Sequence, residues 1–298
     1  MTITWYRGRS NSRSADKTRT SVSPDLVSVL VRTLALVCLF QAAGTAFFVL
    51  LFGQWLPRSS ASIQQLGFWC ALIAVALLGA HQCLDAARMA DSLAGMSDPH
   101  LELLAWGGKG GNATLLEMTG LAVVAFGLTR PVASAGGIAS TGAAMAACAA
   151  VLTGHTSVHA QRGLLAPLLA LHLLLVAFWF GALVPLILCC VRESQQVTAA
   201  VLRGFSAVAG LLVPCIGIAG LVMALVLMPH SASWRSTYGT LVWAKIAAFC
   251  GLLLLAAWNR WRAIPGSPAL RRSIAVEYGV MVAVLALTAT MTTFYSPE

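Results

Sequence analysis

Histidine is the residue type in this sequence with the clearest capacity for chemistry. The segment TGHTSVHAQRGLLAPLLALHLLLVAFWFGALVPL, residues 153–186, carries His155 and His159 just before an apolar stretch and His172 inside it. On a helix, His172 would lie about nine residues, or roughly 13 Å, beyond the preceding loop. An ionisable group at that depth in lipid is costly and is a candidate functional residue, although a bond to a neighbouring carbonyl would also account for it.

A second polar group lies in GAHQCLDAARMAD, residues 79–91. On a helix, His81 and Asp85 share a face, so the carboxylate could orient the imidazole as carboxylates orient metal-bound histidines. Asp85 could equally pair with Arg88 one turn away. Cys83 would lie about 200° around the helix from His81 and is therefore poorly placed to share an ion with it.

Sulfur ligands accompany the histidines. Met228 lies two residues before His230, and Cys189 and Cys190 form a pair at the far end of the span that contains His172. Thioether and thiolate sulfur favour monovalent copper, and imidazole accepts either copper state, so this mixture suits copper better than magnesium or calcium. Packing alone would also account for these sulfur residues.

Three charged residues interrupt apolar sequence, namely Arg32, Glu117 and Lys245. Each costs about 2.5 to 3.5 kcal/mol to insert into a membrane, so these side chains should face the interior of the protein and pair. Glu117 could pair with Arg32 or with Lys245. No phosphate-binding loop, dinucleotide fingerprint, zinc-protease helix or hydrolase elbow is present, which leaves hydrolase and nucleotide-driven pump functions without support.

The elements that carry these residues are membrane-spanning helices. The 298 residues are 58% hydrophobic and 10% charged, with a mean hydropathy of +0.81, whereas soluble domains have roughly 25% charged residues. Apolar windows of about 20 residues, long enough to cross a bilayer, recur along the chain. We predict an all-α polytopic membrane bundle of eight transmembrane helices, with only short loops between spans at residues 25–52, 64–88, 112–129, 133–154, 164–191, 198–228, 238–259 and 273–295.

The organisation around these spans is simple. Residues 1–24 form a basic polar tail with no aromatic platform for bases beyond Trp5 and Tyr6. The tail is therefore predicted to lie in solvent or on the lipid surface and not to bind nucleic acid. Residues 25–154 and 155–298 form two four-helix halves. The first span is too long for a typical signal-peptide core and is predicted to be retained. Most of the eight cysteines lie inside apolar spans, and no disulfide is predicted.

Loop charges predict the orientation. Eight cations fall near the odd-numbered connections, against Arg88, Lys109, Arg162 and Arg235 near the even-numbered ones. Because cations favour the cytoplasmic side, both termini are predicted to be periplasmic, although the five cations of the tail argue the opposite. All six histidines, His81, His100, His155, His159, His172 and His230, would then lie in the outer half.

Four segments of the second half form an ordered pattern. They are HLLLVAFWFGALVPL at 172–186, YGTLVWAK at 238–245, WNR at 258–260 before Pro265, and LRRS at 270–273 followed by Glu277. This pattern resembles that of the copper-resistance protein D (CopD) family. The resemblance implies an eight-span bacterial inner-membrane protein with outside termini that handles copper together with periplasmic copper chaperones of the CopC type. The chain departs from the pattern in lacking a Met/His-rich periplasmic module.

Two functional hypotheses follow. In the first, the chain is a copper transporter and not an enzyme. Its outer-face residues His100, His155, His159 and His230, with Met228, receive copper, and intramembrane His81 and His172 pass it on. In the second, it is a membrane electron carrier or cupric reductase with haem b, in which His81 pairs with His155 or His172 as axial ligands.

Overall fold

The computed structural model describes residues 24–230, 233–262 and 264–295, except for the side chains of Pro24, His155, Thr156 and Arg262. The described residues contain helices and no strands. The α-helices are α1 (Pro24–Phe52), α2 (Ser60–Met89), α3 (Pro99–Gly107), α4 (Lys109–Leu128), α5 (Val132–Ala149), α6 (His155–Val158), α7 (Arg162–Arg192), α8 (Gln195–Leu227), α9 (Thr237–Arg262) and α10 (Pro268–Phe294). Short 3₁₀ helices η1 (Gly53–Trp55), η2 (Leu93–Ser97), η3 (Ala150–Leu152) and η4 (Ser233–Arg235) join them.

Eight helices in the described residues are long and apolar enough to cross a membrane, which confirms the predicted fold class. Their bounds differ from the predicted spans mainly at the polar first turns. The last helix begins at Pro268, before the predicted residue 273, because the Ser267 hydroxyl caps it by accepting a hydrogen bond from the amide of Leu270. Ser194 caps α8 in the same way through the amide of Val197. Capping serines thus extend apolar helices into polar sequence.

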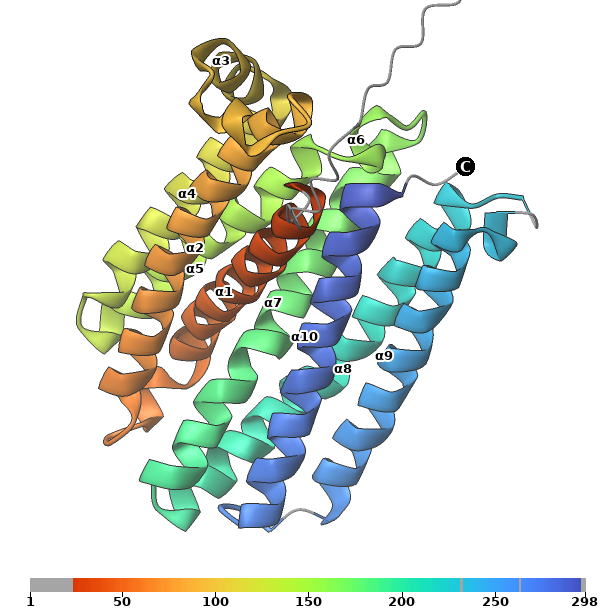
Figure 1. Ribbon diagram of the computed structural model, residues 1–298. Helices are drawn as coiled ribbons and strands as arrows, with labels where there is room; N and C mark the ends of the chain where they lie inside the picture. The colour runs from red at the N-terminus through yellow and green to blue at the C-terminus, as the bar shows by residue number, and fades with distance from the viewer. Residues whose placement is uncertain (1–23, 231–232, 263, 296–298) are drawn as a thin grey trace, which may run out of the picture.

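The eight spans form one bundle with α1 and α7 at its centre (Figure 1). α1 packs on α2, α5, α7 and α10, and α7 packs on α1, α8 and α10. α4 and α5 form a close pair in the first half, whereas α9 packs mainly on α10 at the edge of the second half. α1 begins and α10 ends at the same end of the bundle, the top of Figure 1, which we call the upper end.

Glycines allow the closest helix crossings. Gly44 of α1 meets Gly181 of α7 so closely that a Cβ on either residue would overlap the backbone of the other helix. Gly120 of α4 and Gly142 of α5 meet in the same way. Small residues permit such approaches in membrane bundles, where packing and hydrogen bonds replace the hydrophobic effect as the force that joins helices.

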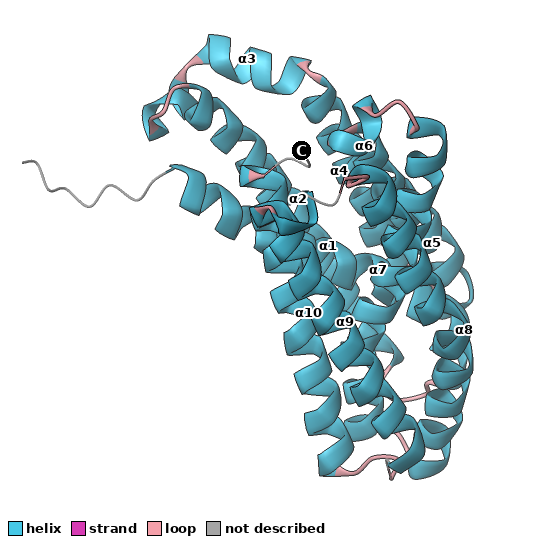
Figure 2. Ribbon diagram, turned by 90° about the vertical axis from the view of Figure 1, so that its right-hand side faces the viewer, coloured by secondary structure: helices cyan, strands magenta, loops and turns pink. Residues whose placement is uncertain are grey.

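The connection between the second and third spans is not the simple loop that was predicted. It contains η2 and α3, and Figure 2 shows α3 lying across the upper end of the bundle. The Asp98 carboxylate starts α3 by accepting hydrogen bonds from the amides of His100 and Leu101. Pro99 occupies the first turn, where its missing N–H costs nothing.

Candidate functional site

His81 lies near the upper end of α2, in a polar cluster that joins α1 to α2. It is buried, with Nε2 3.3 Å from the Ser28 hydroxyl oxygen of α1. Its Nδ1 lies 3.9 Å from Oδ2 of Asp85. The carboxylate is therefore placed to favour a proton on Nδ1, which leaves Nε2 as an acceptor facing Ser28.

Arg88 and Arg32 complete this cluster. Arg88 pairs with Asp85 at 3.3 Å and with Asp25 of α1 at 2.9 Å, and it donates to the carbonyl oxygen of Thr293 in α10. Asp85 therefore contacts both of the partners that its sequence position predicted, His81 and Arg88. Arg32 lies within electrostatic range of Asp85 and of Glu117 in α4. The cluster thus links four of the spanning helices at the upper end.

His172 lies in a different part of the bundle, between α7 and α8. Its Nδ1 is 3.1 Å from the carbonyl oxygen of Ile216, and its ring packs against Gly220. A carbonyl oxygen can only accept, so Nδ1 carries the proton and Nε2 keeps its lone pair. Lys245 of α9 is close enough to act on the ring electrostatically. The structure gives His81 and His172 separate sets of neighbours.

A third polar group joins α7, α9 and α10 and was not predicted as a site. Glu277 is buried in α10, where Oε1 accepts a hydrogen bond of 2.8 Å from Trp179 Nε1. Oε2 accepts one of 3.4 Å from the amide of Asn259. The sequence placed Glu277 only as part of a family pattern. A carboxylate within an apolar helix was the signal available for it.

The remaining candidate ligands lie at the upper end without converging. His100 on α3 and His230 are exposed, whereas Met228 is buried. His159 is half-buried, and its Nδ1 accepts a hydrogen bond from the amide of Gln161. His155 begins α6, but its side chain lies outside the described part of the chain. No group of three or more His, Cys, Asp or Glu residues suited to a metal ion occurs among the described residues.

The cysteine pair lies at the lower end of α7 beside Glu193. Cys189 is buried, with its sulfur 3.9 Å from the Ser59 hydroxyl. Glu193 Oε1 accepts hydrogen bonds from the Ser59 amide and hydroxyl, both at 2.7 Å, and from the Arg58 amide at 3.0 Å. Cys190 and Glu193 border an open pocket of about 360 Å³ that residues 264–267 also line. Packing and helix capping account for the contacts of Cys189 and Glu193 at this end of α7.

Replacing Glu193 with glutamine is expected to destabilise the lower end by about 1 kcal/mol at neutral pH, because the amide accepts hydrogen bonds less strongly than the carboxylate. Partial burial raises the pKa of Glu193, but the hydrogen bonds from Ser59 and Arg58 outweigh it and lower the pKa overall. The stabilisation is therefore present above the unfolded-state pKa, about 4.3, and is lost as pH falls through the lower folded-state pKa.

Thermal unfolding of wild type and Glu193→Gln in detergent, compared between neutral and acid pH, measures this effect. The difference in melting temperature should shrink as the pH falls. A difference that stays constant from pH 7 down to pH 3 would contradict the role given to the ionised carboxylate.

Comparison with known proteins decides the family. Copper resistance protein D of Pseudomonas syringae pv. tomato is 30% identical to the chain over 307 residues, which cover 92% of this chain and 98% of the relative. The chain belongs to the copper resistance protein D family. The family profile named CopD, copper resistance protein D, matches residues 199–291. No solved structure matches the chain significantly.

These matches extend the likeness beyond the second half of the chain. The CopD profile covers α9, most of α8 and most of α10, and so includes Lys245, Asn259 and Glu277. His81 and His172 lie outside the profile match, whereas the relative aligns with most of both halves. The family is thus shown, while the roles of individual histidines and the division at residue 155 stay predictions.

Proposed function

We propose that this member of the CopD family carries copper ions across the bacterial inner membrane. The observation that supports the proposal most is the relationship to a copper resistance protein along nearly the whole chain. The eight spans supply a membrane path without any nucleotide-binding motif, and transport through weak successive sites needs none. Copper is the cargo, delivered as the free ion or by a separate chaperone of the CopC type.

The upper end is proposed to face the periplasm. It carries the first residue of α1 and the last of α10, together with the connections that hold His100, His159 and His230 (Figure 1). The lower end holds the arginine-rich connections, including Arg58, Arg130, Arg192, Arg271 and Arg272. Positive connections remain preferentially in the cytoplasm, so periplasmic copper would meet the histidine-bearing end first.

Two intramembrane imidazoles are proposed as transit ligands. His172 is fixed through Nδ1 by the Ile216 carbonyl, and His81 faces Asp85 through the same atom. Outer contacts of this kind orient metal-binding histidines through Nδ1. Nε2 of His172 is then left for the ion, whereas Nε2 of His81 would exchange its contact with the Ser28 hydroxyl for the ion. The charge of Lys245 near His172 weakens the binding of a cation there. Weak binding suits a site that must release its ion again.

The haem alternative finds no support in the described geometry. Two axial ligands must point at one iron from opposite sides. His81 contacts α1 and its own helix, whereas His172 contacts α8 and lies beside α9. The pairing of His81 with His155 falls on a side chain outside the described residues.

The test is the rate of copper movement into liposomes that contain the purified protein and an internal copper-sensitive dye. His172→Ala and His81→Ala are each expected to lower the initial rate about tenfold or more, because each removes a ligand and not only its support. The control is His100→Ala, which removes one exposed histidine of several at the upper end, outside the bundle, and should transport normally. Wild-type rates in both test variants, at equal protein per liposome, would remove these histidines from the path.

A further inference from the structure

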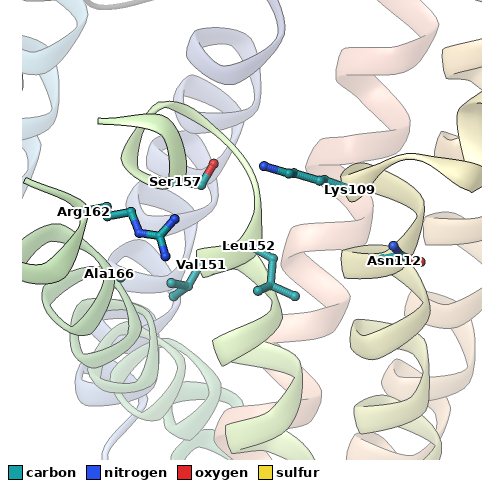
Figure 3. Close-up of a pocket in the computed structure, with 7 residues that line it drawn as sticks. All are labelled: Lys109, Asn112, Val151, Leu152, Ser157, Arg162 and Ala166. Carbon is teal, nitrogen blue, oxygen red and sulfur yellow. The ribbon is translucent and has the colours of Figure 1, made fainter. Parts of the chain in front are cut away.

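A cavity of about 380 Å³ lies at the upper end, away from His81 and His172. Its walls come from the first turns of α4 and α7, from η3 and from α6. The residues that line it are Lys109, Asn112, Val151, Leu152, Ser157, Arg162 and Ala166 (Figure 3). The cavity therefore opens between the two halves of the chain at the level of the membrane surface.

Two cations face each other across this cavity. Figure 3 shows the Lys109 side chain reaching from α4 and the Arg162 side chain reaching from α7 toward the same space. No acidic residue lines the cavity, and neither cation forms an ion pair with any described residue. Like charges that converge on one space repel, and an anion between them would reverse the sign of that interaction.

The other lining groups indicate which chemical parts the anion should have. The Ser157 hydroxyl donates to the carbonyl oxygen of Gly154, so the Asn112 amide is the neutral side-chain donor left for a ligand. Val151, Leu152 and Ala166 form an apolar wall beside these polar groups. The cavity thus combines a site for an anionic headgroup with a surface for hydrocarbon.

The surroundings place this cavity among lipid headgroups. Leu103 and Leu104 of α3 have exposed fractions of 72% and 66%, and Val158 of α6 has 76%. Apolar side chains of that exposure on helices at the end of a membrane bundle are buried by lipid. Trp106 of α3, an aromatic residue of the kind enriched at membrane interfaces, lies three residues before Lys109, the first residue of α4.

We propose that this cavity binds the phosphate headgroup of an anionic phospholipid. The Arg162 guanidinium can hold two phosphate oxygens at once, and Lys109 adds a point charge from the opposite wall. The glycerol and upper acyl carbons lie against Val151 and Leu152. Basic pockets between membrane helices recognise lipid headgroups in this manner. A bound lipid joins α4 to α7 and so braces the two halves at the upper end.

Binding can be measured on the full-length protein in neutral detergent by native mass spectrometry and by the rise in melting temperature on addition of phosphatidylglycerol. The Lys109→Gln, Arg162→Gln double variant is expected to bind phosphatidylglycerol at least about tenfold more weakly than wild type, from the loss of two charge-assisted contacts. The control is Arg203→Gln, Arg272→Gln, which removes the same charge from exposed positions elsewhere. This control should bind as wild type does.

Two further measurements are needed. One tests the site with a variant that keeps both cations, and the other distinguishes a phospholipid headgroup from free phosphate. Leu152→Trp fills the apolar wall while keeping both cations, and it should also lose phosphatidylglycerol. Inorganic phosphate should stabilise the protein far less than the lipid. Equal stabilisation by inorganic phosphate would overturn the lipid assignment, and undiminished lipid binding by the double glutamine variant would overturn the site.

Discussion

Gly44→Leu is expected to leave little folded protein, because Gly44 is the point where the two central helices touch. A Cβ at this position would overlap the carbonyl oxygen of Ala177 and the backbone of Gly181 on α7. Backbone atoms cannot move aside as a flexible side chain does, so the helices must separate. Overpacking of a core typically destabilises a protein by about 1 to 3 kcal/mol. The cost of a leucine that overlaps backbone atoms is expected to reach or exceed the upper end of this range. Copper transport would be lost with the fold.

The measurement is the yield of monodisperse protein after extraction and size-exclusion chromatography, followed by thermal unfolding. Gly137→Leu provides the matched control, because Gly137 also lies in a spanning helix but a Cβ there meets open space. The control should give a normal yield. If Gly44→Leu were recovered in similar amount with a similar melting temperature, α1 and α7 could not be as close as described.

Sequence reasoning predicted the spans well because lipid imposes a single local rule. Every backbone polar group must find a partner within its own segment, so length and apolarity alone specify a helix. α3 escaped prediction because it lies at the surface, is too short to span and contains polar residues. The crossing at Gly44 and Gly181 could not be predicted for another reason. Which two glycines meet depends on how helices that are far apart in the chain pack together.

The contacts of the candidate site also fall into two kinds, those that helical spacing predicts and those that depend on tertiary packing. The contact between His81 and Asp85 follows from helical spacing and was predictable. The Ser28 partner of His81, 53 residues away, and the Trp179 partner of Glu277, 98 residues away, depend on tertiary packing. Sequence depth predicted that His81 and His172 form one relay, and this stays a prediction. The structure adds that the two histidines lie beside different helices. Periodicity gives the face of one helix and does not identify its neighbour.

Packing also selects between two partners for Glu117 that the sequence left open. The charged group that acts on Glu117 is Arg32 of α1, and Arg32 in turn is influenced by Glu117 and Asp85. The described ion pairs do not include a direct one to Arg32, and its Nε is buried without a hydrogen-bond partner. The described interaction between Arg32 and Glu117 is therefore one of charge, in a medium of low dielectric constant.

Arg32→Leu is accordingly expected to destabilise the protein by about 3 kcal/mol, because it leaves Glu117 as a buried charge without its cation. This corresponds to a fall of roughly 5 to 10 °C in melting temperature for a chain of this size. Adding Glu117→Leu to Arg32→Leu should recover at least about 1 kcal/mol, since the double variant has no orphaned charge.

The comparison that decides the pairing is the same cycle with Lys245 in place of Arg32. Lys245→Leu and Glu117→Leu should add in their effects on the melting temperature, because Lys245 lies beside His172 and not beside Glu117. Additive losses for Arg32 and Glu117 would contradict their pairing. A rescue seen only with Lys245 would show that the carboxylate is neutralised from the second half of the bundle. Coupling to Arg32 alone instead ties Glu117 of α4 to the charged cluster that joins α1 and α2.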